Sequence, residues 1–150
     1  MIQGKWFPQG SDLTEVLQIR EAVFGRSQDV IDSGAQSALV YQDDVPAAAG
    51  RIWWQDGAFW LGDIGVLPDY RGQKLGDLTL RLLLFKAQDH FAREVRLICP
   101  AETEGFFTRL GFHRENLLKD GTLELMIPGD EIDLDTCKSC KKKDCPLRTK

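Results

Sequence analysis

The chain has 150 residues, of which 43% are hydrophobic and 28% charged, as expected of one globular domain. No apolar run reaches the roughly 18 residues of a membrane-spanning helix, and the N-terminus has no apolar signal core, so we expect a cytoplasmic protein without membrane contact. The net charge of −4 is uneven, because residues 138–150 hold six Lys/Arg and one Asp, while the remaining residues hold 13 basic and 22 acidic side chains. An acidic body argues against non-specific nucleic-acid binding.

The first half of the chain alternates strand and helix signals. Residues 2–7 predict a strand, and the polar segment 26–36 predicts a loop or a short irregular helix between a helix over residues 12–25 and the next strands. Asp and Asp-Gly turn signals separate the three strand-like runs that follow, at residues 38–42, 47–54 and 58–66. These runs predict an antiparallel meander.

The second half contains the longest expected helix and a final hairpin. Leucines at helical spacing give residues 72–90 a wide apolar stripe, so this helix should be well buried. The remaining expected elements are a strand over residues 95–99, a short helix over 102–110 and hairpin strands over 112–118 and 123–127. The sequence therefore predicts one mixed α/β domain, residues 1–128, in which helices pack against a central, mostly antiparallel sheet. Residues 129–150 form a cysteine-rich, basic tail.

The run PDYRGQKLG, residues 68–76, lies between the third meander strand and the long helix. The first turn of a helix has amide groups without intrahelical partners, and the helix dipole favours an anion there. Arg71 and Lys74 add two cations beside these donors, and Gly72 and Gly76 allow a ligand to approach the backbone. The run therefore fits a pyrophosphate cradle, although a helix start with chance glycines explains it equally well.

VLPDYRGQKLGDLTLRLLL resembles the acetyl-CoA-binding motif of the GNAT superfamily of N-acetyltransferases, Arg/Gln-x-x-Gly-x-Gly/Ala. Arg71 and Gly76 match the first and last positions of the motif, and Lys74 replaces its middle glycine. The segment LICPAETEGFFTRLGFHRE resembles the family's next strand and helix, and the element order is also the family's order. The resemblance covers about residues 2–128.

The resemblance implies a GNAT-like fold and acetyl-CoA as cosubstrate. It implies that the backbone of residues 71–77 binds the pyrophosphate and that the strand edge at residues 64–66 pairs with the pantetheine arm. The cofactor-binding residues expected on this basis are Ile64, Gly65, Val66, Arg71, Gly72, Gln73, Lys74, Leu75, Gly76, Asp77 and Phe107. We expect Lys74 to have helical dihedral angles, because it would then replace glycine without strain.

Acetyl transfer to an amine requires a proton acceptor, a donor for the developing oxyanion and a leaving thiolate. Asp63, just before the expected pantetheine edge, is the favoured base, and the Val66 amide is the expected oxyanion donor. Glu102, Glu104 and His113 are weaker candidates for the base.

The family's usual acid is the tyrosine of a Phe-Tyr pair, and this chain has Phe106-Phe107 instead. Phe107 can pack against the cofactor but cannot donate a proton. Cys99 is the nearby thiol, although a buried core cysteine is the more common case.

The tail carries three cysteines, Cys137, Cys140 and Cys145, in a C-x2-C-x4-C pattern. This spacing suits a zinc ion that takes its fourth ligand from elsewhere; Cys99, His90 and His113 are candidates. A redox role and free thiols on a mobile tail are the alternatives.

The leading hypothesis is an acetyl-CoA-dependent N-acetyltransferase that acts on a primary amine of a small molecule or peptide by direct attack. The alternative is a non-catalytic acyl-CoA-binding sensor or scaffold that docks a partner through the cysteine tail. The sequence leaves open whether the chain forms a homodimer, and it does not identify the acceptor.

Overall fold

A computed structural model describes residues 1–134 of the chain. Within these residues, seven strands form one sheet in the order β1-β2-β3-β4-β5-β7-β6. All neighbouring strands are antiparallel except β4 and β5, which are parallel. The strands are β1 (Ile2–Phe7), β2 (Ala35–Gln42), β3 (Val45–Gln55), β4 (Ala58–Val66), β5 (Glu94–Cys99), β6 (His113–Leu117) and β7 (Leu123–Pro128).

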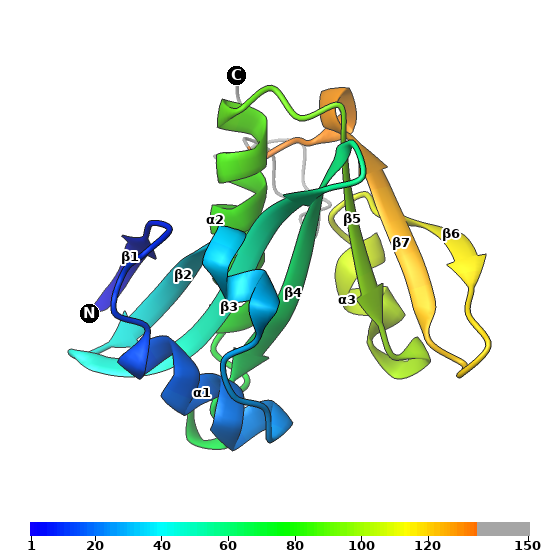
Figure 1. The fold of residues 1–150 in the computed structure, drawn as a ribbon. Helices are drawn as coiled ribbons and strands as arrows, with labels where there is room; N and C mark the ends of the chain where they lie inside the picture. The colour runs from blue at the N-terminus through cyan, green and yellow to red at the C-terminus, as the bar shows by residue number, and fades with distance from the viewer. Residues whose placement is uncertain (135–150) are drawn as a thin grey trace, which may run out of the picture.

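Helices cover both faces of the sheet (Figure 1). One face carries α1 (Thr14–Phe24) and the short 3-10 helix η1 (Val30–Gly34), and the other face carries α2 (Leu75–Asp89) and α3 (Glu104–Thr108). Further 3-10 turns are η2 (Pro68–Tyr70), η3 (Ala101–Thr103) and η4 (Gly129–Glu131). This architecture confirms the mixed α/β fold with a mostly antiparallel sheet that the sequence predicts.

The main core lies between α2, α3 and the sheet. The apolar stripe of α2 buries Leu80, Leu83 and Leu84 completely or almost completely, against residues of β5 and β7 such as Leu97 and Leu125. A smaller cluster packs α1 against β2 and β3 on the opposite face. Ile132 is also buried, and its carbonyl accepts a hydrogen bond from Gln88 Nε2 at 3.1 Å, so packing continues past the boundary expected at residue 128.

The two hairpin turns of the meander have the dihedral angles that their sequences suggest. Asp43 and Asp44, and likewise Asp56 and Gly57, all have positive φ, as type I′ turns require. Such turns match the twist of antiparallel strands, so the local sequence sets the register of β2, β3 and β4.

Strands β4 and β5 pair over a short length only. Their register runs from Phe59 opposite Val95 to Leu61 opposite Leu97 and then stops, although both strands continue. Figure 1 shows the two strands diverging beyond this point. Residues 62–66, five of the nine residues of β4, therefore have one edge that is not hydrogen-bonded to β5. Within residues 1–134, no helix combines the length and apolar character that crossing a membrane requires.

Candidate active site

The N-terminus of α2 offers free backbone donors. Its N-cap, Lys74, makes no side-chain capping hydrogen bond, and the Leu78 amide donates to the Lys74 carbonyl at 3.1 Å. The amides of the first turn therefore point out of the helix without a side-chain cap. This arrangement is the one an anion-binding helix start needs.

Lys74 departs from the geometry expected from the sequence. Its φ of 63° and ψ of 23° lie in the left-handed region, so the expectation of helical angles at this position was wrong. The chain must reverse sharply between the extended Arg71 and the start of α2, and a left-handed residue makes that reversal. The conformation also explains why the related motif has glycine at this position, since glycine adopts it without steric cost.

A cavity of about 330 Å³ lies between the start of α2 and α3. Four cationic side chains and one carboxylate line it, which leaves a surplus of three positive charges. The lining residues are Val66, Tyr70, Arg71, Gly72, Lys74, Leu75, Gly76, Asp77, Arg81, Phe106, Arg109 and Leu110. A cationic cavity against uncapped helix amides is suited to a ligand with several phosphate charges.

Seven of the eleven residues expected to bind the cofactor line this cavity: Val66, Arg71, Gly72, Lys74, Leu75, Gly76 and Asp77. Ile64, Gly65, Gln73 and Phe107 do not. Phe107 is buried at 8% exposure and packs edge-to-face against Phe112, whereas its neighbour Phe106 faces the cavity.

The sequence reasoning missed Tyr70, Arg81 and Arg109. Arg81 pairs with Asp77 one helical turn away, at 2.8 Å. This i,i+4 spacing is the signal that could have identified it.

The free edge of β4 presents backbone groups next to the cavity. The Leu67 amide donates to the Ala47 carbonyl at 2.8 Å, and alternation along an antiparallel pair then directs the Val66 amide away from β3, towards the unpaired edge. Arg71 Nε donates to the Val66 carbonyl at 3.0 Å, which ties the loop to the end of the strand. The Val66 amide is therefore available to a ligand at the edge that β5 leaves unpaired.

Asp63 lies in a β-bulge on β4. Ala49 pairs with Gly65 and Arg51 with Gly62, so that one residue of β3 opposes both Asp63 and the residue after it. Asp63 has a φ of 51°, which its short polar side chain tolerates better than most others. The bulge directs its carboxylate to the face that carries α1.

Three arginines surround the Asp63 carboxylate. Arg26 Nη2 lies 2.5 Å from Oδ1, while Arg51 Nη2 and Arg20 Nε lie 2.9 and 3.5 Å from Oδ2. Each carboxylate oxygen thus faces at least one guanidinium group. Asp63 can accept a proton directly from an amine only when one of these partners moves away, and the nearest one on Oδ1 is Arg26.

Two further carboxylates complete this charged cluster. Arg20 forms a bidentate pair with Asp32 at 2.8 and 3.0 Å, and Arg51 binds Asp29 at 2.7 and 2.9 Å and also Asp32 at 3.1 Å. The Arg51 hydrogen bonds hold the pKa of Asp29 at about 2, below its ordinary 3.8. Burial would raise the pKa of Asp32, but its hydrogen bonds from Arg20 and the Asp29 amide lower it on balance. The cluster fixes η1 against α1, β3 and β4.

The other candidate groups have different surroundings. Glu104 is held by Arg114 in a bidentate pair at 2.9 and 3.1 Å, which lowers the pKa of this carboxyl, and His113 is on the exposed strand β6. Cys99 is buried, and burial raises the pKa of its thiol. Glu102 is exposed in η3.

The proposed zinc ligands Cys137, Cys140 and Cys145 lie outside the residues that the structure describes. Within residues 1–134, no group of three or more His, Cys, Asp or Glu side chains could hold a metal ion.

The described structure is similar to several solved proteins. An acyl-CoA N-acyltransferase from Pseudomonas aeruginosa superposes with a TM-score of 0.77 at 18% identity, over 85% of this chain and 99% of that one. Escherichia coli ElaA superposes with a TM-score of 0.74 at 23% identity, over 85% of this chain and 99% of that one. A GNAT family acetyltransferase from Elizabethkingia anophelis, solved with acetyl-CoA bound, gives 0.68 at 13% identity, over 85% and 97% of the two chains.

These likenesses place the chain among the proteins with the acyl-CoA N-acyltransferase fold. Residues 33–114 match the family described as "Acetyltransferase (GNAT) domain", and no curated protein matches the sequence. The chain therefore belongs to the GNAT acetyltransferase family and is an acyltransferase, as the resemblance implied.

Proposed function

We propose that this protein is an acetyl-CoA-dependent N-acetyltransferase that acetylates a primary amine of a small molecule or peptide. The observation that carries the proposal is the cationic cavity at the uncapped start of α2, which opens beside the free edge of β4. The uncapped amides, together with Arg71, Lys74, Arg81 and Arg109, suit the phosphates of coenzyme A. A structural neighbour that was solved with acetyl-CoA adds support.

The proposed reaction is direct attack by the amine on the thioester. The neutral amine nitrogen attacks the carbonyl carbon, a C–N bond forms, the C–S bond breaks, one proton passes from the nitrogen to the proposed acceptor and then to water, and coenzyme A departs as a thiolate. The Val66 amide is oriented to donate to the developing oxyanion. Phe107 has no hydroxyl, so sulfur leaves as a thiolate and takes its proton from water, which a thiol pKa near 8 to 9 permits.

Asp63 remains the proposed proton acceptor. Its carboxylate lies in the part of β4 that no longer pairs with β5, on the α1 face of the sheet. In that role it would accept the amine proton at Oδ1 after Arg26 has moved aside. Its buried partners Arg20 and Arg51 would keep the carboxylate oriented.

The test combines cofactor binding with turnover. Acetyl-CoA should raise the melting temperature of the wild-type chain, and mass spectrometry of a primary-amine panel should detect acetylated product. The variant Lys74→Glu/Arg109→Glu should lose both effects, because it reverses two cavity charges. The matched control Lys5→Glu/Arg93→Glu reverses two exposed cations outside the cavity and should retain both.

Two outcomes would contradict the proposal. Equal acetyl-CoA binding by the two double variants would show that the cavity is not the cofactor site. Cofactor binding without acetylation of any amine would favour the alternative of a non-catalytic acyl-CoA-binding domain.

Zinc binding by Cys137, Cys140 and Cys145 stays a separate proposal that rests on their spacing. The full chain should then contain one zinc ion per molecule after purification without chelator, as measured by elemental analysis. Replacing the three cysteines by serine should remove it, and a metal-free wild-type chain would refute the proposal.

A further inference from the structure

The cluster around Asp63 has an uneven charge balance. Besides Arg26, the cluster comprises two cations, Arg20 and Arg51, and three carboxylates, the exposed Asp29 and the buried Asp32 and Asp63. The side chains of Arg20, Arg51, Asp32 and Asp63 are all at most 5% exposed. These five residues together carry one surplus negative charge, and Arg26 supplies the compensating positive charge at Asp63.

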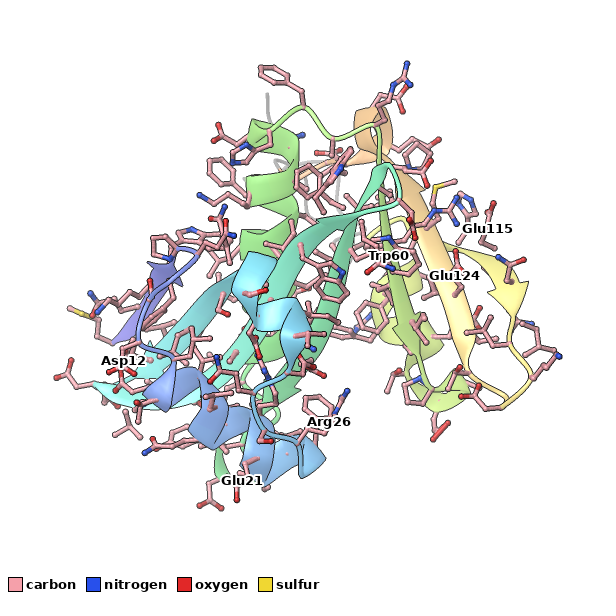
Figure 2. All side chains as sticks on the ribbon, in the orientation of Figure 1. Asp12, Glu21, Arg26, Trp60, Glu115 and Glu124 are labelled. Carbon is pink, nitrogen blue, oxygen red and sulfur yellow. The ribbon has the colours of Figure 1, made fainter. Side chains whose placement is uncertain are left out.

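Arg26 differs from the other two arginines in how it is held. Its side chain is 56% exposed, and its ion pair within residues 1–134 is the single contact with Asp63 Oδ1. Arg20 and Arg51 each bind a second carboxylate in addition to Asp63. Arg26 follows Gly25, the left-handed C-cap of α1, and its guanidinium lies 5.0 Å from the Phe24 ring. Figure 2 shows Arg26 just beyond the end of α1.

The pair of Arg26 and Asp63 lies beside the reaction centre of the proposed function. Asp63 comes two residues after Leu61, where the pairing of β4 with β5 ends, and three residues before Val66, which lines the cofactor cavity. Residues of α2 and α3 line the cavity, while Asp63 contacts Arg20 of α1 and Arg26, which follows α1. A second substrate that approaches from the α1 side therefore meets this ion pair.

We propose that the acceptor is a cationic amine and that its ammonium group replaces Arg26 at Asp63. This inference rests on the proposed acetyltransferase function. In the absence of acceptor, Arg26 occupies the acceptor's binding position, since it places a positive charge where the ammonium group would bind. Arg26 is the exposed half of this pair, so water solvates its guanidinium group when it leaves, and the incoming ammonium group keeps the buried Asp63 carboxylate paired. The buried pairs of Arg20 and Arg51 stay in place, because breaking them would leave buried charges uncompensated.

The exchange has a measurable consequence. If Arg26 contacts Asp63 Oδ1 in most molecules, the amine can bind only to the fraction of molecules in which Oδ1 is free. Its apparent affinity is reduced in proportion to that fraction. Removing Arg26 should then lower the KM of the amine by about threefold to tenfold. The affinity for acetyl-CoA should not change, because Arg26 does not line the cofactor cavity.

The experiment compares Arg26→Ala with the matched control Arg93→Ala, an exposed arginine before the paired end of β5. We expect a lower amine KM in Arg26→Ala, an unchanged KM in Arg93→Ala and a near wild-type KM in Arg26→Lys. An unchanged or higher KM in Arg26→Ala, at unchanged acetyl-CoA affinity, would overturn the inference. Arg26→Gln, which keeps an N–H donor for Asp63, replaces Arg26→Ala if the latter fails to fold.

A second measurement does not depend on acetylation. Methylguanidinium chloride should raise the melting temperature of Arg26→Ala relative to an equal concentration of sodium chloride, since the added cation binds Asp63 in place of the removed side chain. The gain should be absent in Arg93→Ala and in Arg26→Ala/Asp63→Asn. An equal response of Arg26→Ala and Arg93→Ala would overturn the inference even if amines are acetylated. If no amine is acetylated, the proposed function fails. This measurement still decides whether Asp63 binds an external cation when Arg26 is absent.

Discussion

Replacing Lys74 by glycine should make the protein more stable and its cofactor binding weaker. A non-glycine residue in the left-handed region costs about 1–2 kcal/mol, and Lys74 has a φ of 63°. Glycine removes this strain but loses about 0.5–1 kcal/mol more conformational entropy on folding. The net gain in the free energy of unfolding therefore lies between about 0 and 1.5 kcal/mol, with a midpoint of about 0.75 kcal/mol. For a chain of 150 residues this corresponds to a rise in melting temperature of about 1–4 °C.

The same change removes one of the four cations of the cavity. Because Lys74 is exposed, we expect a modest loss of about 0.5–1 kcal/mol, which raises the Kd for acetyl-CoA about twofold to fivefold. Stability is measured by urea denaturation of the cofactor-free protein, and affinity by isothermal titration calorimetry at low and high salt.

Lys74→Ala separates the two effects. Alanine lacks the charge but keeps a β-carbon in the left-handed region. It should therefore lower the affinity for acetyl-CoA as much as glycine does, without the gain in stability. If Lys74→Gly is no more stable than Lys74→Ala, the lysine backbone is not strained and this reasoning fails.

Three further predictions concern the packing, the charged cluster and the cavity. A β-carbon at Gly65 would lie 2.9–3.0 Å from side chains of α1, so Gly65→Ala should destabilise by about 1–3 kcal/mol in urea, whereas Gly34→Ala, with open space around it, should change stability little. Asp29 has a pKa of about 2 in the folded protein against 3.8 ordinarily, so the stability it contributes is present above about pH 4 and is lost as pH falls towards 2. This contribution is about 1 kcal/mol after allowance for the 42% exposure of the Asp29 side chain. Asp29→Asn should therefore flatten the decline of the free energy of unfolding in that pH range. An unchanged decline would contradict the lowered pKa of Asp29. Arg109→Ala should raise the Kd for acetyl-CoA about threefold to tenfold at low salt and by less at about 0.5 M salt. Arg93→Ala is the control. An effect that does not depend on salt would exclude a charge contribution.

Local signals were sufficient to predict most of the fold. The turns at Asp43-Asp44 and Asp56-Gly57 are encoded by adjacent residues, and the leucine spacing of α2 is a property of one segment. The parallel pairing of β4 with β5 follows from the intervening α2, as a crossover connection requires. The place where this pairing ends depends on packing from both strands, and no single segment of the sequence specifies it.

The candidate site was harder to predict because its contacts are distant in sequence. The position of Asp63 in the chain gives no indication of Arg20 and Arg51, which come from a helix and a neighbouring strand. The signal that was available is an arginine inside an otherwise apolar strand, since Arg51 must find carboxylates when it is buried. Lys74 was misjudged for a local reason, because the glycine that it replaces in the related motif marks a left-handed residue.

The two proposals together predict a site that spans both faces of the sheet, and the charges of the two proposed substrates give the reason. Coenzyme A is a polyanion and needs the surplus of cations in the cavity, whereas a cationic acceptor needs the surplus carboxylate of the Asp63 cluster. If these two sets of side chains were adjacent, they would neutralise each other and neither substrate would be favoured. Three residues of β4, roughly 10 Å of strand, separate Asp63 from Val66, and the two charged groups use helices on opposite faces, α1 for the Asp63 cluster and α2 with α3 for the cavity. The unpaired edge of β4 is the place where the two faces meet, so an amine and a thioester held by opposite charges can react there.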